Sequence, residues 1–245
     1  MRSHTIHTGL NFKLEVRKVF YNSQKMTTLT LFISGMSHVH GILWLSSSVI
    51  DEYLLPNKTF DVNHKGISKL IDEWTTCSLN TGNDELDSIV KKVNVHDHKK
   101  SCKRNGQECR FDFPRLPSEE TLVAHPLPKN TPDDERKAIL SEVKAIKDKV
   151  KSALSKKKYE SDVELDTFLQ ELGIPLSKYL WALKISEKGE CVVLKRRVSE
   201  GFVNNYNLNY LFAWQANIDI QICLDAYSVV SYISDYFTKP DSGKL

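Results

Sequence analysis

Residues 37–45 read SHVHGILWL, and this stretch decides how we interpret the fold. Side chains at positions i and i+2 of a β-strand leave the same face, so a strand here directs His38 and His40 toward one point. Two neutral imidazoles that converge in this way supply half of the ligands of a divalent metal site. The same pattern also arises by chance on half-buried strands. The stretch therefore predicts a strand and, with support from elsewhere in the chain, a metal site.

The flanking sequence predicts a sheet around the two histidines. Residues 27–33 are β-branched and apolar, and Gly35 separates them from the histidine stretch, so we expect two adjacent strands. Apolar residues occur on both faces of the second strand, which is typical of a central strand covered by helices. Residues 1–25 show no sustained period and are interpreted as a lead-in.

The rest of the chain alternates helical and extended patterns. Apolar residues spaced by three and four predict helices at 67–74, 86–93, 133–158 and 163–172, whereas four prolines between positions 117 and 132 indicate a loop. Lysines 156–158 suit phosphate contacts or, equally, the negative end of a helix dipole. Residues 191–197 predict a strand that leads into a turn, and residues 218–222 predict a half-polar strand beside the histidine strand. The fold class expected is therefore α/β.

Composition limits the class of protein only broadly. The chain has 245 residues, 40% of them hydrophobic, and a formal net charge of +3, which suits one large or two small domains and permits nucleic-acid binding without requiring it. Five cysteines argue against a secreted disulfide framework and favour a reducing compartment. No apolar run approaches the ~20 residues of a membrane span. We therefore expect a soluble, intracellular protein without a membrane partner.

A second group of metal-ligating residues lies further along the chain. His96, His98, Cys102 and Cys109 fall within fourteen positions and are separated by polar residues suited to a loop. The spacing matches no standard zinc finger, and two reduced cysteines with two surface histidines would look the same. If the four residues bind zinc, the site is structural, because four protein ligands leave no open position for water.

Two tyrosines share one side of a helix predicted at residues 225–239. Tyr232, Tyr236 and Lys239 lie along its flank, beside a buried apolar stripe. Tyrosines often border the core of a helix, so this pattern alone does not establish a function.

Taken together, these motifs resemble the replication-initiator nuclease domain of Helitron transposon proteins, which belong to the His-hydrophobic-His rolling-circle nucleases. The resemblance runs from about Gly35 to Lys239. It rests on several motifs in order: SHVHGILWL at 37–45, HDHKKSC at 96–102, CRFDFP at 109–114, KRR at 195–197, NNYN at 204–207, WQANIDIQ at 214–221 and YISDY at 232–236.

The resemblance implies an α/β (α+β) palm-like domain at residues 26–240, with a central, mainly antiparallel sheet and flanking helices. It places a zinc loop at 96–115 and a helical insertion at 131–175, and leaves 241–245 as a tail. The implied activity is site-specific nicking and joining of single-stranded DNA. His38 and His40 are expected to bind Mg²⁺ or Mn²⁺, which polarises the scissile phosphate. Tyr232 or Tyr236 then attacks and forms a 5′-phosphotyrosine beside a free 3′-OH.

Further residues receive roles by the same resemblance. Because a phenol has a pKa of about 10, the nucleophile needs a nearby cation, and Lys239 is the candidate. Gln221 or Asp219 is expected to be the third metal ligand, since both lie just before the tyrosine helix. Phosphate contacts are expected from Arg110, Arg196 and Arg197, and base stacking from Tyr206 and Trp214, although packing or surface roles suit each of these residues equally.

The chain also departs from the family. Residues 32–35 stand where the family usually carries an acidic residue, an amide and a basic-Gly pair, and Ser37 stands where proline is common. No G-x-x-x-x-G-K-[ST] loop occurs, so we expect a truncated copy whose helicase domain is supplied elsewhere. The expected location is intracellular, in the nucleus. Two functions remain open: a metal-dependent tyrosine nuclease, or a zinc-containing DNA-binding remnant without catalysis.

Overall fold

The computed structural model describes residues 26–34, 38–45, 64–99, 102, 109–156, 163–187 and 189–222. The chain divides into two compact units, Met1–Lys58 and Thr59–Leu245. The first unit contains the histidine strand, and the second contains all the other predicted site residues. None of the helices in the described ranges is long and apolar enough to cross a membrane.

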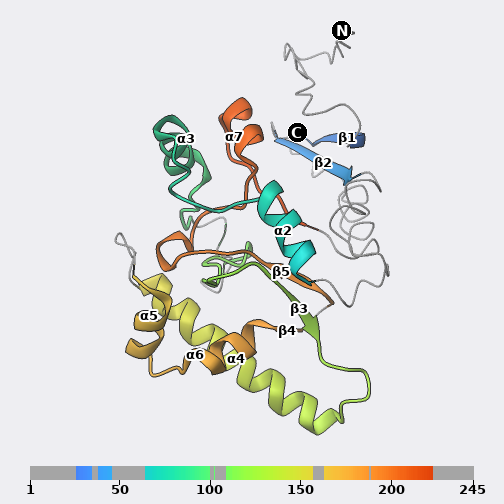
Figure 1. Ribbon diagram of the computed structural model, residues 1–245, viewed down its shortest axis with the longest axis vertical. Helices are drawn as coiled ribbons and strands as arrows, with labels where there is room; N and C mark the ends of the chain where they lie inside the picture. Colours follow the sequence, from blue (N-terminus) through green and yellow to red (C-terminus); the bar gives the residue numbers. More distant parts are fainter. Residues whose placement is uncertain are drawn as a thin grey trace, which may run out of the picture. The chain divides into compact units, whose positions relative to one another are not determined.

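The first unit contains a two-stranded antiparallel sheet. Strand β1 (Met26–Ser34) pairs with β2 (His38–Leu45), and the register places His38 opposite Ser34 and His40 opposite Phe32. The two strands are drawn in blue in Figure 1. The prediction of two adjacent strands, with both histidines on the second, is confirmed.

The second unit combines helices with a small mixed sheet (Figure 1). Strand β3 (Leu122–Pro126) is central, parallel to β4 (Ile185–Ser186) and antiparallel to β5 (Cys191–Val193). The helical segments are α2 (His64–Trp74), α3 (Asp84–Ile89) with the π-turn η1 (Val90–Asn94), α4 (Asp133–Lys156), α5 (Leu165–Glu171), α6 (Leu176–Leu183), the short 3-10 turn η3 (Val198–Glu200) and α7 (Leu208–Trp214). The α/β class and the four predicted helices are therefore confirmed.

The core of the second unit forms around α4. The apolar stripe of this helix, predicted from its spacing, is buried along Val143, Ile146, Val150 and Leu154. These side chains belong to one cluster with buried residues of α5, α6, β3 and β4. Figure 1 shows α5 and α6 beside α4. Because α4 is polar on its other faces, burial of this single stripe fixes how the helix packs.

Tyr179 of α6 provides the first testable prediction. Its ring is fully buried, and its hydroxyl donates a hydrogen bond to the carbonyl oxygen of Pro117 over 2.7 Å. Tyr179→Phe removes this donor and leaves a buried carbonyl unpaired, so we expect the free energy of unfolding to fall by about 1–2 kcal/mol. Urea titration at 25 °C measures the change. An unchanged midpoint with an unchanged slope would show that the bond contributes nothing to stability.

Two segments differ from their predictions. The prediction of a loop at 117–132 is wrong in part, because β3 occupies residues 122–126. Of the four prolines, only Pro126 is in the strand, at its last position, where the missing N–H costs little. The predicted strand at 218–222 is also wrong. Here the backbone N–H of Ile218 donates to the Asn94 side chain, and that of Ile220 to the carbonyl of Asn205. These groups therefore bond to loop residues and not to a neighbouring β-strand.

Candidate metal centre

Four side chains converge after the η1 turn. The ligand atoms of His96, His98, Cys102 and Cys109 all lie within 4.8 Å of one another. The Sγ atom of Cys102 is 3.6 Å from Nδ1 of His98, and that of Cys109 is 3.3 Å from Nε2 of His96. Tetrahedral zinc, with bonds of about 2.3 Å to sulfur and about 2.0 Å to nitrogen, separates such atoms by about 3.5 Å. The cluster can therefore hold a metal ion such as zinc, at the residues predicted from the sequence.

Backbone hydrogen bonds hold the ligand-bearing segments together. The N–H of His96 donates to the carbonyl of Phe202 over 2.7 Å, next to an antiparallel bridge between Val95 and Val203. On the other side, the N–H of Arg110 donates to the carbonyl of Cys102 over 2.9 Å. The histidine segment is thus fixed to a loop distant in sequence, and the two cysteine segments are fixed to each other.

Phenylalanines shield the cluster from water. Phe113 stacks on the His96 ring at 4.4 Å between centroids and 10° between planes, and Phe202 presents its edge to His98 at 5.4 Å. Both cysteines are buried and form a small apolar cluster with these rings. The sequence reasoning assigned no role to Phe113 or Phe202, although Phe113 stands in the CRFDFP motif. A low-dielectric surround strengthens metal–thiolate bonds, so these rings complete the site.

The electrostatics of the cluster also suit a metal. Burial, reinforced by the neighbouring His98, lowers the pKa of His96, while Asp97 partly opposes the shift. A lower pKa keeps the imidazole neutral, which is the form that binds metals. In addition, the backbone N–H of Lys99 donates to the sulfur of Cys102 over 3.3 Å. This bond and the contact of the same sulfur with the Lys99 carbonyl, over 3.1 Å, hold Cys102 in place within its turn.

The residues predicted for the nuclease centre are distributed over both units. His38 and His40 are on β2 of the first unit, whereas Gln221 and Asp219 are exposed residues of the second. The Gln221 amide donates to the Asp219 carboxylate over 3.2 Å. Tyr232, Tyr236 and Lys239, with the helix predicted at 225–239, lie outside the described residues.

Two of the predicted DNA contacts are wrong. The guanidinium of Arg196 is buried and donates to the carbonyls of Glu200 and Val203 and to the amide oxygen of Asn205, over 2.5–2.8 Å. Tyr206 is fully buried, and its hydroxyl donates to the carbonyl of Ser78 over 2.6 Å. Burial raises the pKa of Tyr206 and lowers that of Arg196. Neither side chain reaches solvent, so neither meets a phosphate or a base.

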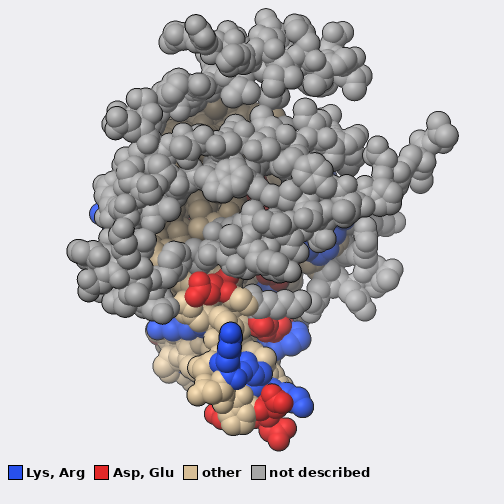
Figure 2. Space-filling view, turned by 90° about the vertical axis from the view of Figure 1, so that its right-hand side faces the viewer, with Lys and Arg blue, Asp and Glu red and all other residues tan. Residues whose placement is uncertain are grey.

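Three other predicted contacts are at the surface. Arg110 and Arg197 are exposed, and Trp214 at the end of α7 has 46% of its surface exposed. On α4, by contrast, lysines alternate with acids: Lys144 pairs with Asp148 over 2.7 Å. Figure 2 shows positive and negative side chains intermixed on the described part of the face in view. Charge alone therefore marks no phosphate-binding stretch along this helix.

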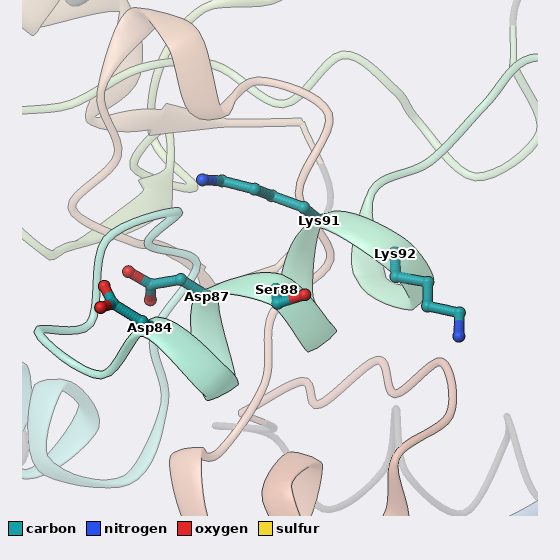
Figure 3. A pocket seen from close by; sticks show the side chains of 5 residues that line it. All are labelled: Asp84, Asp87, Ser88, Lys91 and Lys92. Atoms are coloured by element: carbon teal, nitrogen blue, oxygen red, sulfur yellow. The ribbon is translucent and has the colours of Figure 1, made fainter.

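A surface pocket of about 440 Å³ lies on α3 and η1, lined by Asp84, Asp87, Ser88, Lys91 and Lys92. Figure 3 shows the two lysine side chains extending in different directions, with the two carboxylates on the same side of the helix. The Asp87 carboxylate accepts hydrogen bonds from the backbone N–H and the hydroxyl of Thr81, over 2.7 and 2.6 Å. This carboxylate is engaged in holding the preceding loop, so the pocket offers no assembled ligand set.

Comparison with models of known protein families, with curated proteins and with solved structures gives no match to this chain. The function therefore rests on the chemistry of the described residues and on the motifs in the sequence.

Proposed function

We propose that this chain is a zinc-stabilised, single-stranded DNA-binding domain that nicks and joins DNA as in rolling-circle transposition. The observation that carries the proposal is the convergence of His96, His98, Cys102 and Cys109. This cluster forms from 96–102 and 109–114, two of the motifs on which the resemblance to Helitron nucleases rests. A chance distribution of reduced cysteines and surface histidines would not be expected to bring the four ligand atoms within 4.8 Å of one another.

The proposed reaction uses residues from both ends of the resemblance. His38 and His40 share β2, where positions two apart lie on one face of a strand, and this suits a divalent-ion site. Mg²⁺ or Mn²⁺ bound there supplies Lewis-acid polarisation of a phosphate. The phenol oxygen of Tyr232 or Tyr236 bonds to phosphorus, and the 3′ oxygen leaves and takes up a proton. The 5′-phosphotyrosine keeps the phosphodiester energy for rejoining.

This proposal includes a palm-like arrangement in which β2 is a central strand of a mainly antiparallel sheet. In the described residues β2 pairs with β1 alone, so this arrangement requires a further strand along the other edge of β2. DNA unwinding is not part of the proposed activity, since the sequence carries no Walker-type loop.

The second candidate is a zinc-containing DNA-binding remnant without catalysis. It is favoured by the residues before the dyad, because 32–35 lack the acidic, amide and basic positions usual in the family. In this case the zinc cluster and the exposed cations persist and bind DNA, while His38 and His40 no longer support metal-dependent cleavage.

A covalent-adduct assay tests catalysis. With labelled single-stranded DNA and Mn²⁺, the wild-type chain is expected to form an adduct that survives denaturation. The adduct should disappear in whichever of Tyr232→Phe and Tyr236→Phe removes the nucleophile, and in the double variant. It should also disappear in His38→Ala, which removes a metal ligand. Tyr227→Phe is the matched control, since it lies on the same predicted helix outside the YISDY motif. DNA binding without an adduct under any divalent metal would favour the remnant.

A further inference from the structure

One aromatic side chain beside the metal cluster is left open to solvent. Phe111 has 46% of its surface exposed, whereas Phe113, two positions on in the same motif, is only 6% exposed. Phe113 stacks on His96, while Phe111 meets the His96 ring nearly edge to face at 5.8 Å and 69°. Phe113 therefore shields the metal ligands, whereas the ring of Phe111, close to the same cluster, stays accessible to a ligand.

The turn that carries Phe111 is fixed on both sides. It is closed by the N–H of Asp112, which donates to the carbonyl of Cys109 over 2.9 Å, and Asp112 adopts a left-handed φ of 61°. The Asp112 carboxylate is bonded to Lys151 of α4 and lies 3.8 Å from Arg115. With a metal on Cys109, the Phe111 ring is presented from a rigid support, which lowers the entropy lost when a ligand binds.

Among the described residues that contact this ring or its turn, cations outnumber carboxylates. The Arg110 guanidinium lies over the Phe111 ring at 4.5 Å from its centroid. Lys151 is bonded to the Asp112 carboxylate in the same turn and Arg115 lies 3.8 Å from it, and a zinc ion with two thiolates adds no net charge. An exposed flat ring beside several cations is the combination that single-stranded nucleic acid binds.

We propose that Phe111 is a stacking platform for one unpaired base and that Arg110 pairs with the phosphate of the same nucleotide. The proposal rests on the proposed DNA-binding function and adds to it the position at which the strand is held. Phe111 is not among the DNA contacts expected from the sequence. In a duplex the faces of the bases are covered by their neighbours, so the platform selects single strands. An acidic peptide would use Arg110 but would gain little from the ring.

Fluorescence anisotropy with labelled oligo(dT) tests the platform. Phe111→Ala is expected to weaken binding by about 5- to 150-fold, the range for loss of one base–aromatic stack, whereas Phe111→Trp retains binding. Phe212→Ala is the matched control, because Phe212 is similarly exposed, at 42%, but lies on α7. Arg110→Gln should reduce the dependence of log affinity on log salt by about one phosphate contact. Zinc content, measured for every variant, reports whether the cluster is intact.

The outcomes separate this proposal from the broader one. If the wild-type chain binds oligo(dT) and zinc-replete Phe111→Ala binds equally well, the platform is wrong and DNA binding stands. If Phe111→Ala weakens the binding of single strands and of blunt duplex by the same factor, the proposed platform is also wrong, since stacking needs an unpaired base. If the zinc-loaded wild-type chain binds no oligonucleotide, the proposed function itself fails. Photocrosslinking of a 5-iododeoxyuridine strand to the peptide that contains residue 111 would place the base directly.

Discussion

Removal of the metal is expected to lower the melting temperature of the protein by about 10 °C. The four ligands connect the segment at 96–98 with Cys102 and Cys109, and the backbone N–H of His96 donates to the carbonyl of Phe202. The buried thiols form a small apolar cluster with Phe113 and Phe202. A ligand present at 1,000 times its Kd stabilises the folded state by about 4 kcal/mol. For a domain of this size each kcal/mol is worth roughly 2–4 °C. Differential scanning fluorimetry with and without a chelator measures the shift.

Single substitutions assign this effect to the cluster. Cys102→Ser and Cys109→Ser should each abolish stoichiometric zinc and lower the melting temperature as chelation does, with no further loss when chelator is added. Cys191→Ser is the matched control, because Cys191 is an exposed thiol outside the cluster. Wild-type protein is expected to contain one zinc per chain. Zinc-free wild-type protein with an unchanged melting temperature would mean that the four side chains need no ion to stay together.

The ligands were predictable because all four lie within fourteen positions of the sequence. Their closeness in sequence made a metal loop one of two interpretations, beside two reduced cysteines with two surface histidines, without knowledge of any distant contact. The rings that shield the loop were not predictable to the same extent. Phe202 reaches His98 from a segment far along the chain, and no local pattern marks a phenylalanine in a turn-rich stretch as a cover for a metal.

Elements with a strong local period were also predicted well. Helices α2 and α4 bury one stripe of apolar residues, so their sequences contain the signal directly. Strand β3 is short and flanked by prolines, and these prolines led to the prediction of a loop in spite of its apolar residues. At 218–222 the isoleucines alternate as in a strand, but the backbone N–H groups of Ile218 and Ile220 bond to Asn94 and Asn205 instead of to a neighbouring strand. The local sequence does not indicate these distant partners. Helix α7 begins at the Asn207 cap, in a stretch whose polar residues indicated only a turn.

The basic run at 195–197 shows why charge is an ambiguous signal. Three consecutive cations suggested a surface that meets phosphates, yet Arg196 is only 4% exposed while both of its neighbours in the run are exposed. An antiparallel bridge from Arg196 to Ser118 turns the middle residue inward, where carbonyl groups of a tight turn need a donor. The sequence shows which residues are charged. Whether each residue beside a short β-bridge faces the core or solvent depends on its distant partner strand.

Arg196→Met is expected to lower the free energy of unfolding by about 3–5 kcal/mol, because it leaves three acceptors of the 200–205 turn without their donor in a dry interior. Lys195→Met, at the exposed position before Arg196, is the control and should change stability by less than about 0.5 kcal/mol. Urea unfolding at 25 °C measures both. At temperatures where Arg196→Met remains folded and retains zinc, its affinity for oligo(dT) should equal that of the wild type, because the buried guanidinium does not reach the strand. A folded Arg196→Met protein with reduced DNA affinity would restore Arg196 as a phosphate contact and would imply that the turn at 200–205 opens when DNA binds.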